Sequence, residues 1–186
     1  MPTNEGWWEG KNWFFRIYAS YSDDGGVTWH CGDFVPPGDE GYGNECQLVE
    51  LTDGTVLFNS RSFRGNRLRK ISRSKDGGET WSPLIDDEAL VESECMGSIL
   101  RYSWPEEGES LILFANPASQ HERRRGTVRV SYDEGGSWPV SKMIEEGPFA
   151  YSCLSRLPNG MIGLLYEANG YMEIKFVRFS LDWLER

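Results

Sequence analysis

The sequence is poor in the side chains that build most metal centres and catalytic dyads. It has only two histidines and four cysteines, with no Cys-x-x-Cys pair. A zinc site needs several such ligands at short, characteristic spacings. We therefore expect no metal centre, and no motif implies a cofactor. We expect the cysteines to be free, buried thiols: Cys31, Cys46, Cys95 and Cys153.

Long apolar runs and an excess of positive charge are also missing. No apolar stretch approaches the ~18 residues of a membrane-spanning helix, and the polar start Met1–Glu5 is unlike a secretory signal. The cellular compartment stays open. The net charge is −10, from 19 basic and 29 acidic residues. Because nucleic-acid binding needs a basic surface, we expect no nucleic-acid partner.

Aromatic residues and glycines are abundant, at 13% aromatic and 21 glycines, which favours short strands joined by tight turns. One pattern, Ser-x-Asp-x-Gly-x-Thr-Trp, occurs at Ser22–Trp29 and Ser74–Trp81, and again at Ser131–Trp138 with Ser in place of Thr. The three tryptophans are 52 and 57 residues apart. A period near 50 residues is typical of a four-stranded propeller blade.

The aspartates of this pattern are expected to be structural. In each copy Asp can accept hydrogen bonds from turn N–H groups, Gly can adopt positive φ, and Trp can pack between layers. Because the same residue recurs in each turn, we do not consider these aspartates to be catalytic: Asp24, Asp76 and Asp133.

A second repeat consists of hairpins. The segment Glu45–Leu51 precedes an Asp53-Gly54 turn, and Tyr151–Leu157 precedes an Asn159-Gly160 turn; such dipeptides are strong hairpin signals. Glu45 and Tyr151 each lie eight residues before the turn, and Arg61 and Glu167 each lie eight after it. A third copy begins at Glu94 and returns over residues 111–116. Because inner strands of a propeller start at one mouth of its channel, we expect these polar residues to form a site there.

Taken together, these segments resemble the exo-α-sialidase (neuraminidase) family, and the resemblance covers nearly the whole chain. The recurring turn is similar to that family's Asp box. The other matching segments are Asn44–Gly54 with Asn59-Ser60-Arg61, Phe114–Ser119, and Ala150-Tyr151-Ser152 with Leu164–Glu167. The resemblance implies an all-β, six-bladed β-propeller. Residues 1–186 would form about three and a half blades of it, as a single partial domain.

The family's roles carry over to matching positions. Tyr151 would be the nucleophile and Glu45 the base that accepts its proton. Arg61 and Arg123 would bind the substrate carboxylate, with Arg124 and Arg125 as alternatives to Arg123. Three further residues are candidates for lining the pocket: Glu94, Asn116 and Glu167. A neutral phenol suits this substrate, because a carboxylate nucleophile would be repelled by the sialic acid carboxylate. Arginine binds a carboxylate through two parallel hydrogen bonds.

Two parts of the family pattern have no counterpart here: a third arginine in an Arg-Ile-Pro motif, and an aspartate general acid. Arg16-Ile17-Tyr18 is similar to the first but lies directly before the Asp box at Ser22. A partial propeller would leave strands and apolar surface uncovered. Three explanations follow: a fragment of a longer protein, a chain that pairs with a separate N-terminal half or another copy, or an inactive remnant. We favour the fragment.

Three functions remain open from the sequence. The first is part of an exo-α-sialidase acting on sialylated glycans by a retaining mechanism. The second is a non-catalytic glycan-binding or scaffold propeller, which would not need Glu45 beside Tyr151. The third, trans-sialylation, would use every residue named above.

Overall fold

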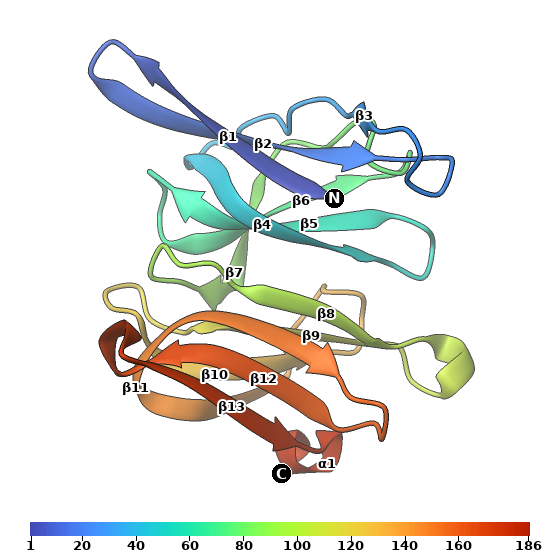
Figure 1. Cartoon of the computed structure of the whole chain (residues 1–186), viewed down its shortest axis with the longest axis vertical. Helices are drawn as coiled ribbons and strands as arrows, with labels where there is room; N and C mark the ends of the chain where they lie inside the picture. Colours follow the sequence, from blue (N-terminus) through green and yellow to red (C-terminus); the bar gives the residue numbers. More distant parts are fainter. The chain divides into compact units, whose positions relative to one another are not determined.

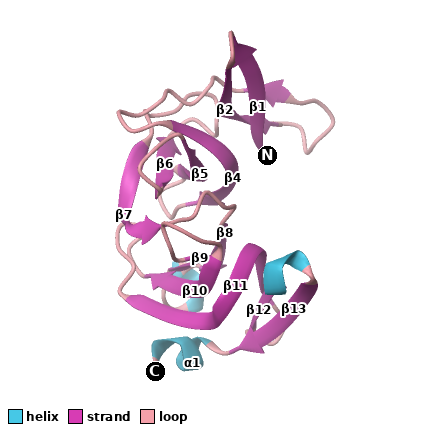
Figure 2. Ribbon diagram, turned by 90° about the vertical axis from the view of Figure 1, so that its left-hand side faces the viewer, coloured by secondary structure: helices cyan, strands magenta, loops and turns pink.

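The structure, a computed structural model, describes all of residues 1–186. Strands predominate, and helix is confined to short stretches (Figure 2). No helix is long and apolar enough to cross a membrane. The elements are β1 (Pro2–Glu9), β2 (Asn12–Tyr21), β3 (His30–Cys31), β4 (Tyr42–Glu50), β5 (Val56–Phe63), β6 (Leu68–Ser74), β7 (Ile85–Val91), β8 (Ser98–Ser103), η1 (Pro105–Glu107), β9 (Leu111–Pro117), β10 (Arg124–Ser131), β11 (Val140–Arg156), β12 (Ile162–Ala168), η2 (Asn169–Tyr171), β13 (Glu173–Phe179) and α1 (Leu181–Glu185).

The chain divides into two compact units, Met1–Glu88 and Ala89–Arg186. The first contains the sheet β1-β2-β3 and most of the sheet β4-β5-β6-β7, whose last strand β7 continues past Glu88. The second contains a sheet of order β13-β12-β11-β10-β9-β8. Strands that are neighbours in sequence are neighbours in each sheet, as in the meanders of propeller blades (Figure 1). The prediction of an all-β fold is confirmed; the assignment of residues 1–186 to one domain stays a prediction.

In the first unit, the two sheets pack closely through small and apolar side chains. Ile17 of β2 is buried against β4, where a Cβ built on Gly43 would lie 2.5 Å from Ile17 Cδ1. Glycine is therefore the residue that lets β2 and β4 approach at this point. The buried cluster between the sheets consists of Ile17, Ala19, Val35, Cys46, Phe58, Trp81 and Leu84.

In the second unit, the long strand β11 belongs to two blades. Its first part pairs with β10, from Val140 to Pro148, and its second part pairs with β12, from Phe149 to Arg156. Divided at this point, the chain forms groups of three, four, four and three strands. The predicted three and a half blades are thus confirmed.

The core of the second unit lies between these two blades. Apolar side chains of β9 and β10 face those of the second part of β11 and of β12, which buries both sheet faces. A Cβ built on Gly126 would lie 2.0 Å from Phe149 Cδ2. Only glycine leaves room for this ring, which stacks on Tyr166 at 4.6 Å. Phe149 is therefore held firmly at the start of the segment that carries Tyr151.

The three Asp boxes have the same hydrogen bonds. In the first, Asp24 accepts from the Ser22 hydroxyl and from the Thr28 N–H, both at 2.8 Å. The Thr28 bonds lower the pKa of Asp24 to about 2. Asp76 and Asp133 accept the equivalent bonds. This confirms that these aspartates stabilise turns.

Two expectations about burial are wrong in part. Cys46 and Cys95 are buried, whereas Cys31 and Cys153 are exposed, although all four cysteines are free. Trp81 and Trp138 are buried, but Trp29 is 55% exposed. The spacing of a repeat determines the turn, whereas burial depends on which other segments pack against it.

Candidate functional site

Glu45 and Arg61 form an ion pair across an irregularity in the β4–β5 hairpin. Gly43 pairs with Ser62, and Cys46 with Ser60, so two residues of β4 stand opposite Arg61 alone. This is a β-bulge, a device that re-aims side chains. Arg61 Nη1 donates to Glu45 Oε2 at 2.9 Å, and the two side chains are 18% and 28% exposed.

One N–H donor of the Arg61 guanidinium, that of Nε, is buried and makes no hydrogen bond. A buried, unsatisfied N–H is costly and is uncommon in folded proteins. The Ser60 hydroxyl stabilises the bulge, because it accepts from the Asn44 N–H at 2.9 Å and donates to Asn44 O at 3.2 Å. The result is a partly exposed cation paired with Glu45 and supported by the bulge.

Tyr151 lies in an equivalent bulge of the second unit. Phe149 pairs with Ala168, and Ser152 with Tyr166, so Ala150 and Tyr151 stand opposite Glu167. The Tyr151 N–H donates to Glu167 Oε2 at 3.2 Å. The sequence-based equivalence of Glu45 with Tyr151, and of Arg61 with Glu167, therefore holds in backbone geometry.

Arg123 lies beside Tyr151. The Phe149 N–H donates to Arg123 O at 2.9 Å, which connects the two segments through their backbones. Arg123 Cζ is 5.4 Å from the centroid of the Tyr151 ring, within range of a cation–π interaction. Burial alone would lower the pKa of Arg123, but Cys95, Tyr171 and Tyr151 together raise it, so the guanidinium stays charged.

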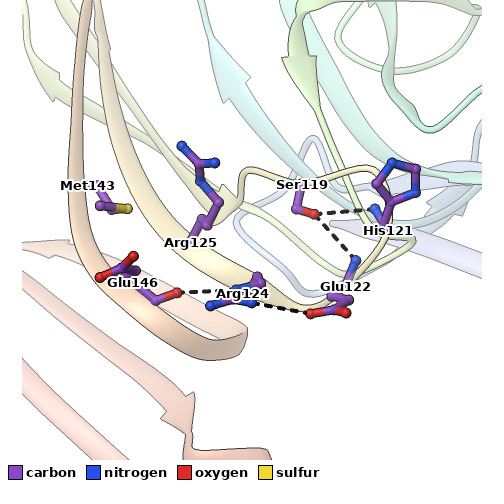
Figure 3. A pocket seen from close by; sticks show the side chains of 7 residues that line it. All are labelled: Ser119, His121, Glu122, Arg124, Arg125, Met143 and Glu146. Carbon is purple, nitrogen blue, oxygen red and sulfur yellow. Dashed lines mark hydrogen bonds and ion pairs between the residues drawn. The ribbon is translucent and has the colours of Figure 1, made fainter.

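The other two arginines of the run face elsewhere. Arg124 and Arg125 line a separate hollow of about 400 Å³, and Figure 3 shows the side chains around it. Arg124 Nε donates to Glu146 O at 3.4 Å, and Arg124 Nη1 lies 3.5 Å from Glu122 Oε2. The structure thus brings Arg123, and not its two neighbours, to Tyr151. The hollow is lined by Ser119, His121, Glu122, Arg124, Arg125, Met143 and Glu146.

The expected strand start at Glu94 and the expected exposure of Asn116 need correction, while Glu94 as a pocket residue stays a prediction. Glu94 does not begin an inner strand: β8 starts at Ser98, and Glu94 lies in a bend with φ of 54°. Its backbone carbonyl accepts from Arg123 Nη2 at 2.9 Å. Asn116 does not line a pocket, because it is fully buried. Its amide accepts from Arg129 Nη1 and donates to Val91 O, so both ends have partners inside the fold.

One residue at this site was missed by the sequence analysis. Tyr171, in η2 between β12 and β13, accepts a hydrogen bond from Arg123 Nη1 at 3.1 Å. It lies outside the hairpins whose spacing repeats, so no periodic signal marks it. The Asn169-Gly170 dipeptide before it indicates only a turn.

Comparison with known proteins agrees with this architecture. The profile of the BNR repeat-like domain family matches residues 8–164. A sialidase of Micromonospora viridifaciens is 40% identical over 91% of this chain and 26% of its own length. The solved structure of a Hadza microbial sialidase has a TM-score of 0.74 at 30% identity, covering 92% of this chain and 32% of that protein. A leech intramolecular trans-sialidase has the same TM-score at 26% identity, covering 93% and 30%.

The chain therefore belongs to the BNR repeat-like domain family, and its fold is that of the sialidase β-propeller. More particularly, it is a member of the exo-α-sialidase family. It spans about a quarter to a third of the length of the relatives named above.

Proposed function

We propose that this chain supplies the nucleophile, the base and two carboxylate-binding arginines of a retaining exo-α-sialidase that removes terminal sialic acid from glycans. Tyr151 is the nucleophile, Glu45 its base, and Arg61 and Arg123 bind the substrate carboxylate. The observation that carries the proposal is the placement of the Arg123 guanidinium beside the Tyr151 phenol. Its relatives are named sialidases, which supports the same substrate class.

The available donors of both arginines suit a carboxylate. Arg123 uses one N–H of each terminal nitrogen, for Tyr171 and for Glu94 O, which leaves one N–H on each. The Arg61 side chain is 18% exposed and donates to Glu45 through Nη1. Guanidinium groups bind carboxylates through such pairs of N–H donors.

In the proposed first step, the phenol oxygen of Tyr151 forms a bond to the anomeric carbon while the glycosidic bond breaks. The phenol proton passes to Glu45, because a phenol with a pKa near 10 is a weak nucleophile at neutral pH. Water then cleaves the tyrosyl–sugar bond, which restores Tyr151 and gives retention of configuration. The leaving alcohol needs a proton from a general acid.

The general acid and the third arginine are the parts of the family pattern that we do not find in these residues. We propose that they come from a segment outside this sequence, so the 186-residue chain alone should hydrolyse 4-methylumbelliferyl sialoside only at the background rate. Robust hydrolysis by the purified chain would contradict this part of the proposal.

The nucleophile can be tested without the general acid. In 2,3-difluorosialic acid the group on the anomeric carbon is fluoride, which leaves without being protonated. Attack by Tyr151 would form the oxygen–carbon bond, release fluoride and pass the phenol proton to Glu45. We expect a covalent adduct on Tyr151, detected by intact mass and peptide mapping.

Variants make this test specific. Tyr151→Phe should abolish labelling, and Glu45→Gln should slow it by about 10²–10⁴-fold, the usual contribution of a general base. Arg123→Lys should weaken it, whereas the matched control Arg125→Lys, in the separate hollow, should not. Binding of N-acetylneuraminic acid without any labelling would favour the non-catalytic glycan-binding alternative, and labelling elsewhere would exclude Tyr151 as nucleophile.

A further inference from the structure

The two hydrogen-bond acceptors of Arg123 come from unusual backbone. Glu94, which provides its carbonyl, has φ of 54°, and Tyr171, which provides its hydroxyl, has φ of 72°. Left-handed conformations are unfavourable for residues with a Cβ and tend to persist at functional sites. The Arg123 guanidinium is therefore hydrogen-bonded by two residues whose backbone conformations are both unfavourable.

The turn that carries Tyr171 is left-handed throughout. Asn169, Gly170 and Tyr171 have φ of 48°, 63° and 72°. Local bonds support the turn: Asn169 Nδ2 donates to Glu173 Oε1 at 3.1 Å, and the Met172 N–H donates to Asn169 O at 3.3 Å. The ring of Tyr171 is not packed into the core, since the residue is 58% exposed. Burial of the ring thus does not explain why tyrosine occupies this position.

From these observations we propose that Tyr171 is a positioning residue for Arg123. Its hydroxyl and the Glu94 carbonyl orient the guanidinium so that one N–H of each terminal nitrogen stays available to a substrate carboxylate. Because the Tyr171 oxygen accepts from Arg123, its own hydrogen remains available for an oxygen of that anion. This inference rests on the proposed role of Arg123 in carboxylate binding.

The labelling reaction with 2,3-difluorosialic acid separates positioning from chemistry. Tyr171→Phe keeps the ring and removes the hydroxyl. We expect the half-saturating concentration to rise about 3–10-fold, the net contribution of an ordinary hydrogen bond. The maximal labelling rate should stay within about twofold, because Tyr151 and Glu45 are unchanged. Tyr132→Phe is the matched control, since that phenol bonds Glu185 elsewhere in the same unit.

Two further variants separate positioning from a structural role. In an Arg123→Lys background, Tyr171→Phe should have no additional effect on half-saturation, because its partner is already lost. Tyr171→Gly should unfold at the same temperature as the wild type or a higher one, because glycine tolerates φ of 72°. It should nevertheless bind at least as poorly as Tyr171→Phe.

The contact itself can be measured without any ligand. In arginine-labelled protein, the Arg123 guanidinium signals, assigned with Arg123→Lys, should shift and exchange faster in Tyr171→Phe but not in Tyr132→Phe. Unchanged signals, or a fall in maximal rate with unchanged half-saturation, would overturn the role of Tyr171. If the wild type is not labelled, or Arg123→Lys labels normally, the proposed function fails, while the guanidinium signals still decide whether Tyr171 orients Arg123.

Discussion

The hairpins β4–β5 and β11–β12 use the same backbone device for different chemistry. Each has a bulge in which two residues oppose one, Asn44 and Glu45 opposite Arg61 in the first unit and Ala150 and Tyr151 opposite Glu167 in the second. In the first, the opposed side chains form an ion pair. In the second, the Glu167 carboxylate accepts the Tyr151 backbone N–H. The repeat gives the two bulges the same backbone geometry, and the different side chains at equivalent positions give them different chemistry.

The largest expected difference in stability concerns the glycines packed near each bulge, Gly43 within β4 and Gly126 of β10, which faces Phe149 of β11. Gly126→Ala would place a Cβ 2.0 Å from the buried Phe149 ring, whereas Gly43→Ala meets the tip of Ile17 at 2.5 Å. The buried ring cannot move aside, whereas the end of the Ile17 side chain can. We therefore expect Gly126→Ala to lower the unfolding free energy by about 3 kcal/mol and Gly43→Ala to lower it by about 1–2 kcal/mol. Urea denaturation measures both.

Gly147→Ala is the control for this pair of variants. Gly147 lies in β11, and its Cβ would meet only the Glu145 side chain, with Oε1 at 3.3 Å. This flexible carboxylate can move, so the change should be within about 0.5 kcal/mol. Equal losses for Gly126→Ala and Gly43→Ala would show that the two bulges are anchored alike.

A smaller difference in stability is expected between substitutions of the two bulge carboxylates, Glu45 and Glu167. Glu45→Gln removes the charge paired with Arg61, which should cost about 0.5–1 kcal/mol. Glu167→Gln keeps an oxygen for the Tyr151 N–H, so its cost should stay below about 0.5 kcal/mol. Thermal unfolding in low salt and in 1 M NaCl checks this, because salt should reduce only the Glu45 effect. The same salt dependence in both variants would contradict the comparison.

The smallest expected effect is a difference in acid sensitivity. Two Asp boxes lie in the first unit, at Asp24 and Asp76, and one in the second, at Asp133. Hydrogen bonds lower the pKa of Asp24, mainly from Thr28, and of Asp76, mainly from Ser74. For Asp133, burial opposes the shift, but the bonds from Ser137 outweigh it and lower the pKa.

The sign of the pH effect follows from these shifts. A lowered folded-state pKa stabilises the fold above the unfolded value near 4, and this stabilisation disappears as the pH falls toward the folded value, about 2 for Asp24. In NMR spectra from pH 5 to 2, the Trp81 indole signal should therefore broaden at higher pH than that of Trp138. Asp24→Asn should flatten the dependence in the first unit only. Simultaneous loss of both signals would contradict this.

Predictions from the sequence succeeded where the determinants are local. The Asp-box turns and the hairpins depend on Asp, Gly and Asx-Gly dipeptides at short range, so spacing alone located them. They failed at Glu94, where a bend replaces the expected start of a strand, and at Asn116, whose amide is used inside the core. Neither difference has a periodic signature, because each depends on segments that are distant in sequence.

By itself, the sequence determined the blade period, the turns, the equivalence of Glu45 with Tyr151, and the resemblance to sialidases. Only the tertiary structure decided that Arg123 approaches Tyr151 while Arg124 and Arg125 face another hollow, and that Tyr171 bonds this arginine. The reason is physical. Turns and strand pairing follow from short-range hydrogen bonding, whereas the direction of a long side chain follows from the packing and partners that folding brings around it.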